Sequence, residues 1–206
     1  MNLKVENLSC ERNERYLFTG LSFELGCGEL IQIDGSNGSG KTTLLRMVSG
    51  LLPVYEGTIR WGNSPINESR PEYMSELVFV GHKNGIKDEL TADENLRIDQ
   101  SLNGRQSGVS YVQALEQLGI AQCQHQLCRE LSAGQRQRVA LARLLISVAA
   151  LWVLDEPLTA LDRTAQEIVR ELLEEHVRGG GLALITSHQD MELHEQTKRT
   201  IRLGDG

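Results

Sequence analysis

The 206-residue chain contains no apolar run that approaches the ~18 to 20 residues required for a transmembrane helix. Its first seven residues also lack the apolar run of a signal peptide. Basic residues are in deficit, with 21 Lys and Arg against 28 Asp and Glu and a formal net charge of -7. A nucleic-acid partner is not expected, because phosphate backbones usually bind a basic surface. We expect a protein of the cytoplasm that reaches a membrane only through a partner.

Cysteine is also scarce, and its spacing does not favour a metal centre. Four cysteines are expected to be free thiols, the default in a reducing compartment: Cys10, Cys27, Cys123 and Cys128. The stretch 123–128 reads Cys-Gln-His-Gln-Leu-Cys and offers only three soft ligands, with no second pair at zinc-site spacing. We therefore interpret its residues as ordinary packing or surface residues rather than as metal ligands.

The residues that are present give the composition of a soluble globular protein, and the length fits one domain. Apolar strand patterns occur at 21–25, 30–33, 58–61, 77–80, 150–154, 182–186 and 199–203. The first 35 residues are expected to form short strands, and residues 62–73 to be rich in loop. Helical spacing prevails over 91–147 and 162–176. Strands that alternate with helices predict an α/β fold with a largely parallel sheet covered on both faces.

The most informative stretch is a glycine-rich loop between the strand pattern at 30–33 and a helical pattern at 43–48. It follows the pattern G-x-x-x-x-G-K-[ST] and consists of Gly35, Ser36, Asn37, Gly38, Ser39, Gly40, Lys41 and Thr42, with Thr43 directly behind. Such a loop presents backbone N–H groups and a helix N-terminus to a polyphosphate. Lys41 would reach the outer phosphates, and Thr42 would offer its hydroxyl to Mg²⁺. The chain is therefore expected to bind a nucleoside triphosphate.

Two carboxylates follow the apolar strand at 150–154 without a gap. The carboxyl ends of parallel strands open toward the phosphate loop, so Asp155 and Glu156 can both face the nucleotide. Asp155 would hold Mg²⁺, directly or through water, and Glu156 would act as general base on the attacking water. The alternative is an acidic pair that shapes the turn before Pro157.

A second segment, Leu131-Ser132-Ala133-Gly134-Gln135, stands at the start of a predicted helix. The free N–H groups of a helix start can bind an anion. Ser132 and Gln135 also fit a capping box, and the two interpretations can hold together. Another capping box is expected at Thr91 and Glu94.

In this order, the phosphate loop, Leu-Ser-x-Gly-Gln, the strand with Asp155-Glu156, Leu158–Asp162 and Ser187-His188 resemble the motifs of an ATP-binding-cassette (ABC) ATPase. The resemblance covers essentially the whole chain. It implies a P-loop NTPase fold with a mostly parallel core sheet, an N-terminal antiparallel β subdomain and an α-helical signature subdomain. The single domain would divide into an α/β core at about 1–84 and 148–206 and a helical part at about 85–147.

The resemblance also implies roles that only a dimer can fulfil. In this family the Leu-Ser-x-Gly-Gln segment contacts the γ-phosphate of ATP bound by a second copy, which assigns Ser132, Gly134 and Gln135 to the partner's nucleotide. Asp162 would couple the two sites across the dimer. His188 would contact the γ-phosphate and position Glu156 and water, whereas its alternative is a local hydrogen bond.

Two positions depart from the family pattern. His82 stands where the family usually has a Gln at the end of the strand at 77–80, so it would sense Mg²⁺ or the attacking water, or else pack at the rim of the site. The family also stacks an aromatic residue on adenine, and here Arg12 falls near that place with Tyr16 four residues later. The stacking residue stays open between these two.

A narrower resemblance is to the haem-exporter ATPases of bacterial cytochrome c maturation. It is carried by Cys10-Glu11-Arg12, His82, Gly85-Ile86-Lys87 before Leu90-Thr91-Ala92, and the short C-terminus. It implies a homodimer on the cytoplasmic face of the bacterial inner membrane, integral membrane permease subunits as partners, and an indirect role toward a haem chaperone. The segment 83–89 would line the groove for the membrane subunit, or would form a plain surface loop.

The chain itself is not expected to bind haem, because it has no Cys-x-x-Cys-His attachment site. Two other assignments stay open at this stage. One is the ATPase of a transporter for another cargo. The other is a soluble ABC protein that works on ribosomes or DNA, although such proteins usually carry two cassettes or a long coiled-coil insertion.

Overall fold

The computed structural model describes residues 1–83, 85–103, 107–187, 191 and 198–204. Its strands and helices follow in the order β1 (Leu3–Arg12), β2 (Arg15–Leu25), β3 (Leu30–Gly35), α1 (Lys41–Val48), β4 (Glu56–Trp61), β5 (Ser64–Pro65), α2 (Arg70–Ser75), β6 (Leu77–Val80), α3 (Ala92–Asn103), α4 (Tyr111–Gln117), α5 (Ala133–Ile146), β7 (Leu151–Asp155), α6 (Arg163–Arg178), β8 (Leu182–Thr186) and β9 (Lys198–Leu203). Short 3₁₀ turns lie between α4 and α5.

The strands form two sheets. Five strands in the order β6-β7-β8-β3-β9 pair in parallel throughout, and four strands in the order β2-β1-β4-β5 pair antiparallel. In the parallel sheet, Val80 lies opposite Leu154 and Asp155 lies opposite Thr186, so these strands end at one common edge. The expected α/β fold with a parallel core and an antiparallel N-terminal sheet is confirmed.

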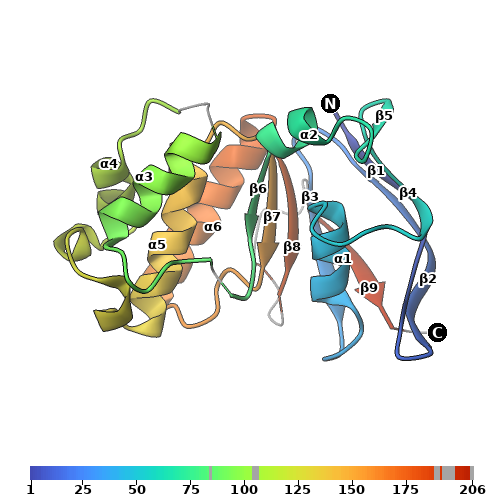
Figure 1. The fold of residues 1–206 in the computed structure, drawn as a ribbon, viewed down its shortest axis with the longest axis horizontal. Helices are drawn as coiled ribbons and strands as arrows, with labels where there is room; N and C mark the ends of the chain where they lie inside the picture. Colours follow the sequence, from blue (N-terminus) through green and yellow to red (C-terminus); the bar gives the residue numbers. More distant parts are fainter. Residues whose placement is uncertain (84, 104–106, 188–190, 192–197, 205–206) are drawn as a thin grey trace.

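Both faces of the parallel sheet are covered, because successive side chains of its strands enter different cores. In β7, Leu151 and Val153 pack in one core with α1 and the antiparallel sheet. Trp152 and Leu154 pack in the other core with α5 and α6. Figure 1 shows the consequence, with α1 on one side of strands β6–β8 and helices α3 to α6 on the other. The phosphate loop and the start of α5 are therefore carried on opposite faces.

Side-chain caps define several helix starts. The predicted capping box before α3 is confirmed, since the Thr91 N–H donates to the Glu94 carboxylate over 2.8 Å and the Glu94 N–H donates to Thr91 Oγ1 over 3.2 Å. The box at Ser132 and Gln135 before α5 is confirmed as well. Asp162 caps α6 by accepting from the Ala165 N–H over 2.9 Å. In each case a polar residue directly before a helical pattern of apolar residues lies at the start of the helix.

Two local expectations are refined by the structure. The strands expected as short within the first 35 residues include β1 and β2, of 10 and 11 residues, because shifts in their pairing register let both continue past irregular positions. The segment 62–73, expected to be rich in loop, also contains β5 and the start of α2. Pro71 lies in the first turn of α2, where a missing N–H costs nothing, so this proline marks a helix start rather than a loop.

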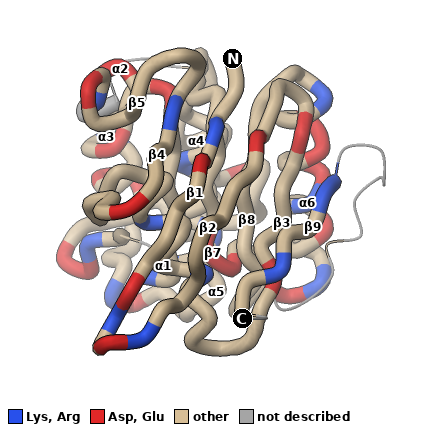
Figure 2. Tube along the Cα trace, turned by 90° about the vertical axis from the view of Figure 1, so that its right-hand side faces the viewer, with Lys and Arg blue, Asp and Glu red and all other residues tan. Residues whose placement is uncertain are grey.

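Helices α3 and α4 pack on α5, and α5 also packs on β6. The division into a core at about 1–84 and 148–206 and a helical part at about 85–147 stays a proposal. Within the described ranges, none of the helices combines the length and the apolar character needed to span a membrane. In Figure 2, acidic and basic positions are interspersed along the strands of the face shown.

Candidate nucleotide-binding site

The glycine-rich loop joins the carboxyl end of β3 to the first residue of α1. Gly35, Gly38 and Gly40 have φ angles of 152°, 87° and 98°, in the region that favours glycine. A Cβ at Gly35 would lie 2.6 Å from both the Leu203 carbonyl oxygen and Ser39 Oγ, so no side chain fits there. The backbone at this turn therefore carries no side chains at its glycines and leads directly into the N-terminus of α1. The N–H groups of such a turn and helix start can bind a polyphosphate.

Two side chains complete this loop. The Lys41 ammonium is buried and donates to the carbonyl oxygens of Gly35 and Ser36 over 2.6 and 3.1 Å. The Ser39 hydroxyl is buried and has no hydrogen-bond partner among the described atoms. A buried cation and an unpartnered buried hydroxyl within one bare loop form a set of groups that fits a phosphate anion.

Residues from three elements meet beside the loop. Asp155, at the end of β7, is 3% exposed and accepts from Thr42 Oγ1 at Oδ2 over 2.9 Å. Its Oδ1 accepts from Thr186 Oγ1, at the end of β8, over 2.7 Å. Thr42 and Asp155, each assigned to Mg²⁺ from the sequence, are thus hydrogen-bonded to one another, and their role toward the metal stays a prediction. These hard oxygen donors are the type that Mg²⁺ prefers.

Thr186 is the site residue that sequence reasoning missed. Its hydroxyl donates to Asp155 and accepts from the Glu156 N–H over 2.9 Å, so it holds both acidic residues. The side chain is fully buried. A polar residue that closes the apolar strand 182–186 is a signal that could have found it, because the neighbouring strand closes on Asp155 in the same way.

Glu156 follows in an unusual backbone conformation, with a φ of 53°. Its N–H donates to Thr186, and its Oε2 accepts from Thr159 Oγ1 over 3.2 Å. The Thr159 N–H also bonds the Glu156 carbonyl oxygen over 3.1 Å, so Glu156 does open the turn that the alternative interpretation expected. Asp155 has no part in that turn among the hydrogen bonds of the described residues, and is bound to the loop threonine instead.

The segment at Ser132 is built as a helix start. Ser132 Oγ accepts from the Gln135 N–H over 3.2 Å, and the Ser132 N–H donates to Gln135 Oε1 over 2.8 Å. A Cβ at Gly134 would lie 2.6 Å from the Ala160 carbonyl oxygen, which excludes any side chain there. Because α5 lies across the sheet from α1, the fold does not put Ser132 on the face that carries its own phosphate loop (Figure 1).

Of the two candidate histidines, the structure describes His82 but not His188. His82 is exposed and comes two residues after Val80, which pairs with Leu154, so it lies at the same edge of the sheet as Glu156. His188 lies outside the described residues, directly after the buried Ser187, and its role stays a prediction.

A cavity of about 610 Å³ adjoins the phosphate loop and is lined by residues that include Ser36, Ser39, Arg15, Tyr16 and Arg202. Tyr16 is 56% exposed there. Arg12 instead lines a neighbouring cavity beside Thr43 and Arg46, which Tyr16 also borders. Of the two residues left open for base stacking, the structure places Tyr16 in the cavity next to the phosphate loop.

Comparisons with known proteins agree with this geometry. A sequence profile of the ABC transporter family matches residues 18–159. A relative from Nitrosococcus oceani is 51% identical over 95% of this chain and 90% of its own length. A relative from Vibrio vulnificus is 48% identical over 98% of this chain and 100% of its own length. Both relatives carry the name cytochrome c biogenesis ATP-binding export protein CcmA.

Solved structures show the same fold. An ATP-binding subunit of an ABC transporter superposes with a TM-score of 0.87 at 21% identity, covering 98% of this chain and 86% of the other. The dimeric structure of MJ0796, a bacterial ABC transporter cassette, gives 0.82 at 26% identity, covering 98% and 94%. MJ0796 in a post-hydrolysis state with ADP and phosphate gives 0.82 at 27% identity, covering 99% and 95%.

Proposed function

Since the chain belongs to the ABC transporter family, and within it to the cytochrome c biogenesis ATP-binding export proteins, we propose that it hydrolyses ATP for a membrane complex of cytochrome c maturation. The observation that carries the proposal is the cluster of Thr42, Asp155 and Thr186 beside the bare loop of Gly35–Lys41. This cluster joins a polyphosphate cradle to hard oxygen ligands at the ends of two parallel strands.

Each group of the site has a distinct task in hydrolysis. The loop N–H groups and Lys41 bind the phosphates, and Tyr16 stacks on the base. Thr42 and Asp155 would hold Mg²⁺, which when bound supplies charge neutralisation at the phosphate oxygens. Glu156 takes a proton from a water that attacks the γ-phosphorus, and the bond to the bridging oxygen of ADP breaks, which releases phosphate.

Two histidines assist this step. His188 contacts the γ-phosphate and orients Glu156 and the water. His82 follows β6 at the same edge of the sheet and senses the metal or the water in place of the usual Gln. A neutral imidazole accepts a hydrogen bond as Gln does, but it can also take a proton near neutral pH.

The active form is a dimer of two copies. Ser132, Gly134 and Gln135 contact the γ-phosphate bound by the partner copy, and Asp162 couples the two sites. The position of α5 across the sheet from α1 supports this arrangement, as does the dimeric state of the MJ0796 cassette. A monomer is therefore expected to hydrolyse ATP poorly.

The dimer acts as a peripheral subunit on the cytoplasmic face of the bacterial inner membrane. Its partners are the permease subunits of the maturation complex, and hydrolysis powers haem export or the release of a haem-loaded chaperone. The names of the relatives and their coverage of nearly the whole chain support this pathway.

A pull-down tests the pathway. Tagged Glu156→Gln, which is expected to bind ATP without hydrolysing it, is purified with ATP in mild detergent. The proteins that co-purify are identified by mass spectrometry. Lys41→Ala, which is expected to bind ATP weakly, serves as the matched control. Membrane proteins of cytochrome maturation and a haem chaperone are the expected companions. A different permease would refute the haem pathway, and ribosomal companions alone would refute the membrane role.

A further inference from the structure

The segment that carries Glu156 is strained at two places. Glu156 and Ala160 have φ angles of 53° and 64°, a region that residues other than glycine seldom occupy. Such conformations persist where the surrounding structure imposes them, and they gather at functional sites. The segment from Glu156 to Asp162, here called the catalytic segment, must therefore be held by its neighbours.

Helix α5 contacts the catalytic segment at three points within its first two turns. The bare Cα of Gly134 leaves room for the Ala160 carbonyl, which a Cβ would meet at 2.6 Å. The buried Gln137 donates from Nε2 to the Pro157 carbonyl oxygen over 3.2 Å. Arg138 donates from Nη2 to Asp162 over 2.6 Å. The contacts are thus spread along the segment, from Pro157 to Asp162.

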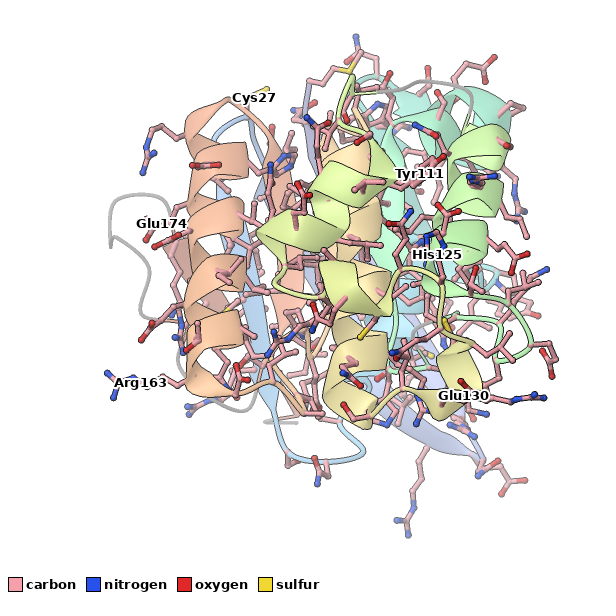
Figure 3. All side chains as sticks on the ribbon, turned by 90° about the vertical axis from the view of Figure 1, so that its left-hand side faces the viewer. Cys27, Tyr111, His125, Glu130, Arg163 and Glu174 are labelled. Atoms are coloured by element: carbon pink, nitrogen blue, oxygen red, sulfur yellow. The ribbon has the colours of Figure 1, made fainter. Side chains whose placement is uncertain are left out.

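The Asp162 carboxylate ties two helices together. Its Oδ2 accepts from Arg138 on α5, while its Oδ1 caps α6 through the Ala165 N–H. Arg138 is itself mostly buried and also donates from Nη1 to the Leu118 carbonyl oxygen over 3.3 Å. In Figure 3, Glu130 just before α5 and Arg163 at the start of α6 both lie in the lower part of the view, so the two helices begin at the same end of the molecule.

We propose that Gln137 and Arg138 are positioning residues for hydrolysis, which hold the catalytic segment, and with it Glu156, in a fixed position relative to α5, the helix that Ser132 caps. The inference rests on the proposed function, because it assigns the general base to Glu156 and the partner's ATP to Ser132. When Ser132 contacts the partner's ATP, the start of α5 is displaced. The three contacts between α5 and the catalytic segment transmit this displacement to Glu156. Hydrolysis is thereby tied to dimer closure.

A double-mutant cycle on the purified full chain tests the ion pair. Asp162→Asn retains a good helix cap but loses the charge that Arg138 binds. We expect Arg138→Gln to lower kcat roughly tenfold, on the scale of losses caused by a misplaced reacting group, while KM for ATP stays within about twofold. In the Asp162→Asn background, Arg138→Gln is expected to cause no further loss, since the two residues act as one unit.

A second variant and a control separate positioning from general damage to α5. Gln137→Leu keeps the volume but removes the donor to Pro157, and it should also lower kcat at unchanged KM. Arg143→Gln is the matched control, because Arg143 lies on the same helix and pairs with Asp99 over 2.8 Å, away from the catalytic segment. This control is expected to keep the kcat of the unaltered chain.

The outcomes distinguish this inference from the proposed function. Glu156→Gln that carries Arg138→Gln should still form a dimer with ATP, as measured by light scattering, and a loss of that dimer would assign Arg138 to association instead. If the unaltered chain hydrolyses ATP but the Gln137 and Arg138 variants keep its kcat, only the positioning role is wrong. If the unaltered chain lacks ATPase activity, the proposed function is wrong and this inference with it.

Discussion

The carboxyl and amino ends of the parallel sheet are built from different kinds of residues. At the carboxyl end, Asp155 and Thr186 are polar, and Glu156 is strained. At the amino end, the His176 ring of α6 stacks on Trp152 of β7, with centroids 3.8 Å apart and 7° between the planes. The carboxyl end thus gathers polar groups from neighbouring strands, whereas the amino end is closed by ring packing.

His176 shows how the amino end is closed. Its Nε2 lies 3.2 Å from the carbonyl oxygens of two residues. Ala150 directly precedes β7, and Leu182 is the first residue of β8. Because carbonyls only accept, the ring must carry its proton on Nε2. We therefore expect substitutions at the carboxyl end to lower the proposed ATPase activity and substitutions at the amino end to lower stability.

The largest effect is expected for Glu156→Gln at the carboxyl end. Loss of the general base should lower kcat by about 100-fold or more, while ATP binding persists and an ATP-bound dimer accumulates. Steady-state ATPase assays and light scattering measure both effects. Glu167→Gln, which loses only an exposed pair with Arg163, is the matched control and should retain activity. A variant that stays monomeric with ATP at every concentration would contradict the dimer.

Tyr16→Ala tests whether Tyr16 stacks on the base of ATP in the cavity next to the phosphate loop. Loss of stacking should weaken ATP binding by roughly tenfold, since an aromatic contact with a base is worth about 1 to 3 kcal/mol. Isothermal titration with ATP measures the change. Arg12→Ala is the control, and we expect its affinity to stay within about twofold. The reverse ranking would make Arg12 the stacking residue.

His176→Phe tests the amino end, where a change should affect stability and spare catalysis. The phenyl ring can still stack on Trp152 but cannot donate to the two carbonyls, so the free energy of unfolding at pH 7.5 should fall by about 1 kcal/mol. ATPase activity should stay unchanged below the melting temperature. A large loss of kcat in a folded variant would break the separation of the two ends.

The same variant carries a pH prediction. Burial lowers the pKa of His176 in the folded protein, although the two carbonyls act in the opposite direction. The unfolded chain therefore binds more protons as the pH falls below about 6.5, and the stability that the neutral ring contributes is lost on acidification. Urea unfolding at pH 7.5 and 5.5 should show a steeper loss for the unaltered chain than for His176→Phe. The exposed His125, labelled in Figure 3, gives the control His125→Gln, which should keep the steeper loss.

The smallest effect is expected for His82→Gln. Activity should persist, because the Gln side chain accepts the same hydrogen bond as a neutral imidazole. Steady-state ATPase assays measure the change in kcat. His125→Gln again serves as the control for an imidazole remote from the site. A large loss of kcat in a folded His82→Gln variant would contradict the idea that Gln can replace His82.

Much of the site was predictable because its parts are local. The phosphate loop, the acidic pair after β7 and the capping boxes each lie within a few consecutive residues, so spacing alone predicts their geometry. Thr186 and Tyr16 were harder, because Thr186 meets Asp155 from a different strand and Tyr16 reaches the loop from the antiparallel sheet. The polar end of strand 182–186 signals Thr186 as a candidate, but which strands lie side by side, and so which groups meet, is set by the sheet order.

The sequence by itself determined the class of chemistry. A phosphate-binding loop is defined by residue types at fixed spacing, here the glycines followed by Lys41 and Thr42. The tertiary structure decided which residues serve that chemistry. Thr42 meets Asp155 across 113 positions of the chain, and α5 meets the catalytic segment through Gln137 and Arg138. Such contacts depend on sheet register and on helix packing, which are set by the burial of the whole apolar pattern. Local spacing cannot contain them.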